Sequence, residues 1–120
     1  MIEEYHFGTI TINGKTYNHD VEIRWTGEVL DWWRKESHII DFDDIKRALN
    51  HDPEVIIIGT GESGVARVTD RTKKEIESRG IKLIIDVTGE AVKTFNIIKE
   101  ESEEEKSRQA KVIGLFHLTC

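Results

Sequence analysis

Val55-Ile56-Ile57-Ile58 runs directly into Gly59-Thr60-Gly61-Glu62-Ser63-Gly64, so a continuous β-branched segment ends in a glycine-rich loop. An uninterrupted apolar run of this kind is typical of a strand that is buried on both faces, and such strands are usually central in a parallel sheet. We therefore place the centre of the hydrophobic core at residues 55–58 and expect an α/β fold.

A charged helix and a second strand are predicted downstream of the loop. Thr69 or Asp70 can cap a helix that runs to Arg79, and Gly80 can end it. Residues 81–86, Ile-Lys-Leu-Ile-Ile-Asp, then predict a second buried strand. Strand, crossover helix and strand form a right-handed βαβ unit.

A second crossover is predicted after this strand. Thr88 can cap the next helix, and a last strand is expected at residues 112–118. The apolar residues of the helix share one face: Ala91, Val92, Phe95 and Ile98. The downstream half of the chain therefore predicts a three-layer α/β core with βαβ units.

The N-terminal third has a different pattern, in which apolar and polar residues alternate. Residues 5–12 predict a strand, Asn13-Gly14 suits a two-residue type I′ turn, and residues 15–17 can return as a second strand. Residues 21–25 alternate again and are expected to continue the same antiparallel sheet, while residues 43–49 predict a short helix. The complete prediction is a mixed α/β (α+β) fold in which an N-terminal antiparallel β-meander packs on the α/β core.

Length, composition and charge narrow the classes of function. A chain of 120 residues with 38% hydrophobic residues suits one domain, residues 1–120. The net charge of -6 and the absence of Lys or Arg blocks make nucleic acids and anionic membranes poor partners. No apolar run approaches the roughly 20 residues that a membrane span needs, and Met1-Ile2-Glu3-Glu4 does not resemble a targeting segment. We expect a cytoplasmic protein.

The glycine-rich loop has the spacing of a dinucleotide-binding fingerprint, because Gly59, Gly61 and Gly64 fit G-x-G-x-x-G. The match fails in its context. The fingerprint needs a helix that begins within the glycines, whereas residues 65–68 alternate like a strand, and Glu62 would repel a phosphate. We interpret the loop as a sharp turn at the carboxyl edge of the sheet. Because α/β folds tend to bind ligands at this edge, we keep a small-ligand pocket there as an alternative.

Signatures of metal binding and catalysis are missing from the sequence. Five histidines are spread along the chain, and none forms an i, i+4 pair that would place two ligands on one helical face. Cys120 is the only cysteine, so no cysteine cage can form within one chain. His19-Asp20 and His51-Asp52 can each orient an imidazole, but both resemble turns and neither has a recognisable nucleophile. We expect no metal, no cofactor and no catalytic residue.

Two adjacent tryptophans mark a second candidate binding region in the sequence. Trp32 and Trp33 cannot both be buried in the same way in a regular structure, so at least one is expected near the surface. Arg34 follows them directly, and exposed tryptophan beside arginine is common at binding hot spots. The alternative is that both rings cover the open end of the sheet.

Several segments in this order carry a resemblance over nearly the whole chain: Phe7-Gly8, Trp33 with His38, residues 55–61, Thr88-x-x-Ala91, Phe95-Asn96 and the end Phe116-His117-Leu118-Thr119-Cys120. Together they resemble a small α/β domain family of unknown function. It is found in archaea and bacteria and in two animal proteins, an adipogenesis-associated protein and a mitochondrial respiratory complex I assembly factor. The resemblance implies a β-sheet layer on a compact α/β core and no established catalytic activity. We do not transfer the mitochondrial assembly role, because we expect no transit peptide in this sequence.

Two functions from different classes remain open. The preferred hypothesis is a non-enzymatic binding or assembly module. Its surface would include Trp33, His38, Gly59, Thr60 and Gly61 and would hold a protein partner or a second copy of the chain. The alternative is a small-molecule binding protein or an unrecognised enzyme with its pocket at residues 59–64.

Overall fold

The computed structural model describes residues 1–104 and 109–120, and a five-stranded sheet forms its centre. In spatial order the strands are β5 (Val29–Asp31), β4 (Val21–Arg24), β10 (Val112–His117), β7 (Val55–Thr60) and β9 (Lys82–Asp86). Strands β10, β7 and β9 are parallel, while β4 runs antiparallel to both β10 and β5. The βαβ units predicted from the sequence are therefore confirmed.

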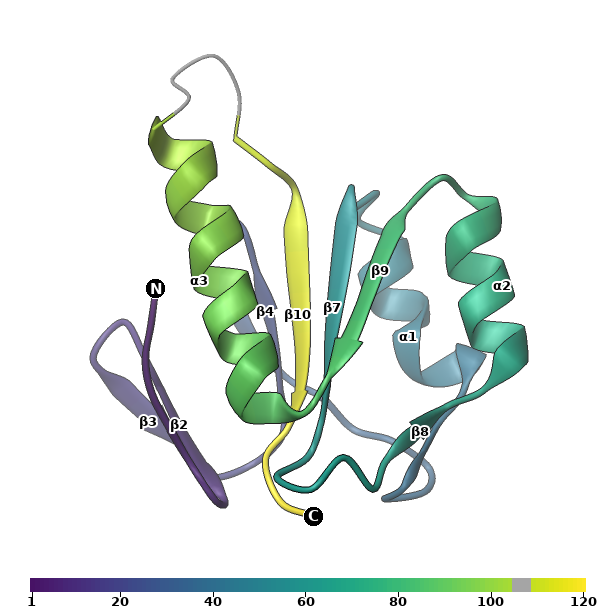
Figure 1. The fold of residues 1–120 in the computed structure, drawn as a ribbon, viewed down its shortest axis with the longest axis horizontal. Helices are drawn as coiled ribbons and strands as arrows, with labels where there is room; N and C mark the ends of the chain where they lie inside the picture. The colour runs from purple at the N-terminus through teal and green to yellow at the C-terminus, as the bar shows by residue number, and fades with distance from the viewer. Residues whose placement is uncertain (105–108) are drawn as a thin grey trace.

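Helices cover both faces of this sheet, as Figure 1 shows. On one face lie α3 (Thr88–Glu104) and a small three-stranded sheet made of β1 (Ile2–His6), β2 (Thr9–Ile12) and β3 (Lys15–Tyr17). On the other face lie α1 (Phe42–Leu49) and α2 (Asp70–Ser78). None of the helices within the described residues is long and apolar enough to cross a membrane.

Strand β7 joins the two halves of the core. Ile56 and Ile58 pack in the cluster under α1 and α2, and Ile57 packs in the cluster under α3. All three side chains are fully buried, which confirms the prediction that the β-branched run is a central strand covered on both faces.

The predicted start of α2 is also confirmed, and the helix ends at Ser78, one residue before the predicted Arg79. The Thr69 hydroxyl accepts a hydrogen bond from the backbone N–H of Thr72, so Thr69 is the N-cap, and Gly80 follows the last turn. Helix α1 begins one residue earlier than expected, because Asp41 caps it and forms a reciprocal capping box with Asp44.

The N-terminal strands differ from the prediction in two ways. Residues 5–12 are not one strand, because the chain turns at Phe7-Gly8 between β1 and β2. The next turn is as predicted: Asn13 and Gly14 have φ values of 49° and 82°, which a type I′ turn requires. Strand β4 does not extend this meander. It pairs with β10 instead, because its fully buried residues complete the large sheet.

Strand β9 also departs from the prediction of a second buried strand. It is the outermost strand of the sheet, and Lys82, Ile85 and Asp86 are exposed. An apolar run indicates coverage of the two faces of a strand, but it carries no signal for a neighbour at the edge.

One further strand pair lies outside the large sheet. Strands β6 (Ile39–Ile40) and β8 (Arg67–Val68) form a short parallel pair near the carboxyl ends of the central strands. Strand β8 confirms the strand-like reading of residues 65–68.

Candidate functional site

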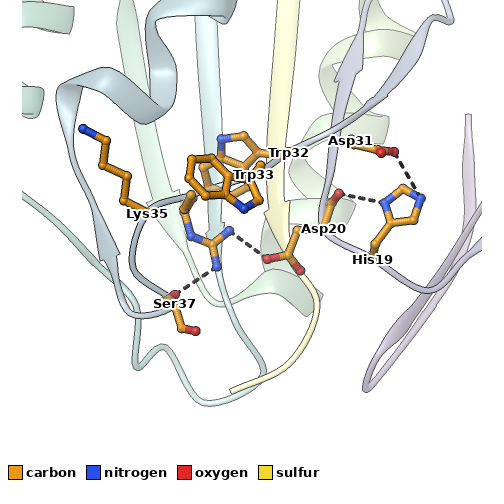
Figure 2. A pocket seen from close by; sticks show the side chains of 8 residues that line it. His19, Asp20, Asp31, Trp32, Trp33, Lys35 and Ser37 are labelled. Carbon is orange, nitrogen blue, oxygen red and sulfur yellow. Dashed lines mark hydrogen bonds and ion pairs between the residues drawn. The ribbon is translucent and has the colours of Figure 1, made fainter.

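Trp32 and Trp33 have opposite environments. Trp32 is buried, and its indole Nε1–H donates a 2.9 Å hydrogen bond to the carbonyl oxygen of Asp44 in α1. The side chain of Trp33 is 75% exposed. The prediction that at least one of the rings lies at the surface is confirmed. Figure 2 shows both tryptophans among the residues that line a pocket with His19 and Asp20.

Arg34 fixes the chain on the other side of Trp33. Its guanidinium stacks over the Trp32 ring at 4.5 Å from the centroid. Nη1 donates to Asp20 Oδ2 at 2.7 Å, and Nη2 donates to the Ser37 carbonyl oxygen at 2.9 Å. Because both neighbours of Trp33 are anchored, the exposed indole is held on a rigid support.

Asp20 is the centre of a polar network that ties the start of β4 to the end of β10. One carboxylate oxygen, Oδ2, lies 2.7 Å from Nδ1 of His117, and Oδ1 accepts the backbone N–H of Leu118 at 2.8 Å. Burial of the carboxyl favours its neutral form, but the hydrogen bonds from His117, Leu118 and Arg34 outweigh burial and lower the pKa of Asp20. Asp20 is therefore an anion at neutral pH.

The buried ring of His117 is oriented by this anion. An ionised carboxylate can only accept a hydrogen bond, so Nδ1 of His117 needs a proton to bond to Asp20. Nη2 of Arg34 can only donate, and it lies 2.9 Å from the same nitrogen, so Nδ1 bonds to one of these two partners at a time. Among the described residues, the buried side-chain polar atoms without a hydrogen-bond partner are Nε2 of His117 and Nε of Arg34. The exposed ring of His38 contacts the His117 ring edge to face, with centroids 6.2 Å apart. Asp20 and His117 together resemble the Asp–His half of a catalytic triad. Within the described residues, however, no hydroxyl or thiol forms a hydrogen bond with Nε2 of His117.

Two shallow depressions flank Trp33. The first has a volume of about 380 Å³ and is lined by His19, Asp20, Asp31, Trp32, Trp33, Arg34, Lys35 and Ser37. The second has a volume of about 310 Å³ and is lined by Asp31, Trp32, Trp33, Asp43, Asp44 and Arg47. We call the residues that line these two depressions the Trp33 surface.

The glycine-rich loop is packed against other parts of the chain. A Cβ at Gly59 would lie 2.8 Å from Oγ1 of Thr88, and a Cβ at Gly61 would lie 2.6 Å from the carbonyl oxygen of Thr119. The C-terminal tail is also bonded to the loop, because the N–H of Glu62 donates to the same Thr119 oxygen at 2.8 Å. The space over Gly61 is thus filled by the tail of the protein.

Thr88 has a different role from the predicted cap. It is the first residue of α3, and its hydroxyl accepts from the Gly61 N–H at 2.8 Å and donates to the His117 carbonyl oxygen at 2.6 Å. One hydroxyl therefore holds the loop, β10 and α3 together, and it does so because α3 starts directly beside the loop.

A larger pocket opens on the other side of the loop. It has a volume of about 490 Å³. Its lining combines apolar, polar and charged residues from the loop, β6, β8, α2 and β9: Ile39, Thr60, Gly64, Ala66, Arg67, Val68, Thr69, Asp70, Lys73 and Ile85. Of the five site residues expected from the sequence, Thr60 alone lines this pocket, and its hydroxyl donates to the Asp86 carbonyl oxygen.

The predicted site residues fall into two groups that meet at His117. Trp33 lies on its own surface, and His38 contacts the His117 ring. Thr60 is the register partner of His117 in β7, next to Gly59 and Gly61. The residues that make this connection, Asp20, Arg34 and His117, were not predicted together. The sequence had placed Asp20 beside His19, whereas its carboxylate orients a ring 97 positions away.

The arrangement of layers and strands defines a mixed α/β domain. Residues 2–110 match the family described as "Protein of unknown function (DUF498/DUF598)", and the chain belongs to this family.

Solved structures agree with this assignment. The conserved hypothetical protein PH1505 from Pyrococcus horikoshii OT3 is 27% identical with a TM-score of 0.82, over 100% of this chain and 99% of that one. A protein described as MT938 is 25% identical with a TM-score of 0.76, over 100% and 98% of the two chains. A protein described as an outer membrane protein from Bartonella henselae is 22% identical with a TM-score of 0.78, over 99% and 94%, and supports the fold alone.

Proposed function

We propose that this protein is a non-enzymatic binding module that holds a protein partner through the Trp33 surface. The observation that carries the proposal is the Trp33 indole, 75% exposed between two anchored residues. A large aromatic ring on a rigid support loses little conformational freedom on binding, which is why such residues dominate interface energies.

The charges beside Trp33 favour a basic partner segment. Asp31 and Asp43 are exposed, and both line one of the two depressions together with Asp44 and a single cation, Arg47. A hydrogen bond and the positive charge from Lys46, with further help from Lys35, lower the pKa of Asp43, which is therefore ionised. A Lys or Arg side chain can stack on the indole face while the Asp31 carboxylate, which is 86% exposed, neutralises it. We therefore propose a partner that presents Lys or Arg beside apolar residues.

Trp33→Ala tests this proposal. Because the ring is exposed, the free energy of unfolding of the variant should lie within about 0.5 kcal/mol of that of the wild type. Peptides selected from a random library on the wild-type protein should be rich in Lys and Arg. They should bind the variant about 30-fold or more weakly, measured by calorimetry.

A matched control uses a different exposed apolar residue. Ile97 in α3 is 53% exposed, and Ile97→Ala should leave peptide affinity unchanged. Selected peptides that bind Trp33→Ala as tightly as the wild type, or that lack basic residues, would contradict the proposal.

A second candidate function is small-molecule binding in the 490 Å³ pocket, which has the size of a ligand site and lies at the carboxyl end of β7. Arg67 and Lys73 line it with a single acid, Asp70, so the charged side chains of the lining are net positive. Ile39, Val68 and Ile85 supply apolar walls. This combination favours a small organic carboxylate with an apolar body.

Thermal shifts with a series from butyrate to octanoate test the second candidate. The wild type should gain stability as the chain lengthens, and Arg67→Ala and Lys73→Ala should each reduce the gain. Lys74→Ala removes the same charge from a neighbouring position outside the pocket lining and should keep the full response. The candidate fails if no acid stabilises the wild type, or if all three variants respond alike.

A further inference from the structure

Strand β9 leaves one edge of the large sheet unpaired. In the described residues it pairs with β7 alone, and Figure 1 shows no further strand beside it. An open edge presents a row of backbone N–H and C=O groups that can pair with another chain. The edge of β9 is therefore a candidate interface.

The backbone groups that face outward can be assigned from the ladder. The N–H of Lys82 donates to the Glu54 carbonyl oxygen at the start of β7, and the Asp86 carbonyl oxygen accepts the Thr60 hydroxyl. Lys82 and Asp86 thus point their backbone groups toward β7, as does Ile84 between them. Because successive residues of a strand alternate, Leu83 and Ile85 point theirs outward.

The usual protection of an edge strand is weak here. Natural edges are blunted by proline, by bulges or by charged residues along the strand. In Lys82-Leu83-Ile84-Ile85-Asp86 the charges stand only at the two ends, and the register with β7 is regular. The apolar centre includes Ile85, which is 38% exposed. Such an edge invites a partner strand.

We propose that β9 pairs antiparallel with β9 of a second copy of this chain, about a two-fold axis at Ile84. In this register Lys82 lies opposite Asp86 of the second copy, and Asp86 lies opposite its Lys82. The five-residue sequence is therefore self-complementary in charge. Opposite charges at cross-strand positions are favourable, and like charges there are unfavourable.

The same register matches the backbone groups. Leu83 of one copy and Ile85 of the other exchange two backbone hydrogen bonds. Ile85 of the first copy and Leu83 of the second exchange two more. Lys82 and Asp86 fall at non-hydrogen-bonded positions, where facing side chains come closest. An axis moved to Leu83 would place Asp86 opposite Gly80, and an axis at Ile85 would place Lys82 opposite Thr88, which lies in α3. Only the axis at Ile84 pairs both charges.

Charge reversal provides the test, with sedimentation velocity as the measurement. In a dimer of Lys82→Asp, the introduced aspartate lies opposite Asp86 of the second copy, so two acids meet across the axis. In a dimer of Asp86→Lys, two lysines meet at the same positions. Each variant alone should dimerise at least about tenfold more weakly than the wild type. An equimolar mixture should dimerise again, because every cross-strand pair in the mixed dimer joins opposite charges.

The controls separate this interface from folding, from net charge and from the Trp33 surface. Lys74→Asp makes the same charge change as Lys82→Asp on exposed helix surface and should leave dimerisation intact. Circular dichroism checks the fold, above all for Asp86→Lys, because the Asp86 carboxylate accepts the Val87 N–H. Trp33→Ala should dimerise like the wild type, so failure of the proposed function would leave this result untouched.

The outcomes decide the proposal. Weakened dimers of each single variant and recovery in the mixture would support pairing through β9. A wild-type chain that stays monomeric at roughly 1 mM would overturn it. Dimers that form equally well with either charge variant would also overturn it, since they would have to use another surface.

Discussion

Asp20→Ala is expected to lower the free energy of unfolding by about 3–5 kcal/mol, the cost of removing one member of a buried ion pair. The variant leaves the Arg34 guanidinium, whose side chain is 4% exposed, without its carboxylate. It also removes the acceptors for His117 and for the Leu118 N–H. Three connections between the start of β4, the Trp33 segment and the end of β10 are lost together.

Thermal unfolding measures this effect, with a drop in Tm of roughly 10–20 °C. Asp31→Ala is the matched control, because that carboxylate is 86% exposed and its contact with His19 is an exposed pair. Asp20→Asn should fall between the two, since it keeps the shape of the side chain and one acceptor. A loss for Asp20→Ala no larger than that for Asp31→Ala would show that the network does not hold the fold.

The same group sets a pH dependence. The pKa of Asp20 is lowered by folding, so its contribution is complete above the unfolded-state pKa of about 3.9 and is lost as the pH falls through the lower folded-state pKa. Wild type and Asp20→Asn should therefore differ most above pH 4 and converge in stronger acid. Asp41 and Asp43 also have lowered pKa values, but their effects are common to both proteins and cancel in the comparison. A difference that stays constant down to about pH 2 would contradict this assignment.

The elements that the sequence predicted well are those with local signals. The β-branched run of β7 and the Thr69 cap of α2 depend on neighbouring residues, and both match the structure. Partners at long range were predicted poorly. The alternation in β4 fits any antiparallel neighbour, and only the folded chain shows that the neighbour is β10 instead of β3.

The candidate site follows the same rule. Adjacent tryptophans predict that one ring is exposed without showing which one, and the choice of Trp33 depends on the distant Asp44 carbonyl that binds Trp32. The link between Asp20 and His117 spans 97 positions and has no local pattern. The glycine-rich loop was correctly predicted to be a turn. The sequence carried no signal that the C-terminal tail would pack on this loop.

Gly61→Ala is expected to destabilise the protein by about 2–4 kcal/mol, for two separable reasons. The residue has a φ of +104°, which alanine adopts only at a cost of about 1–3 kcal/mol. The new Cβ would also lie 2.6 Å and 2.8 Å from the carbonyl oxygens of Thr119 and Cys120. Because Thr119 is tied to the Glu62 N–H, the tail can withdraw only by losing that hydrogen bond.

Gly80→Ala separates the two costs, because Gly80 has a similarly left-handed φ of +74° and no atom within 4 Å of the new Cβ. Chemical denaturation should show that Gly80→Ala loses about 1 kcal/mol of unfolding free energy. The excess loss at Gly61 then measures contact with the tail together with the strain of its larger φ. Removal of Thr119 and Cys120 should destabilise the wild type but cost the Gly61→Ala variant less. Equal losses for Gly61→Ala and Gly80→Ala would mean that the tail does not pack on the loop in solution. In that case the space over Gly61 would again be open to a ligand, and the small-molecule alternative would gain support.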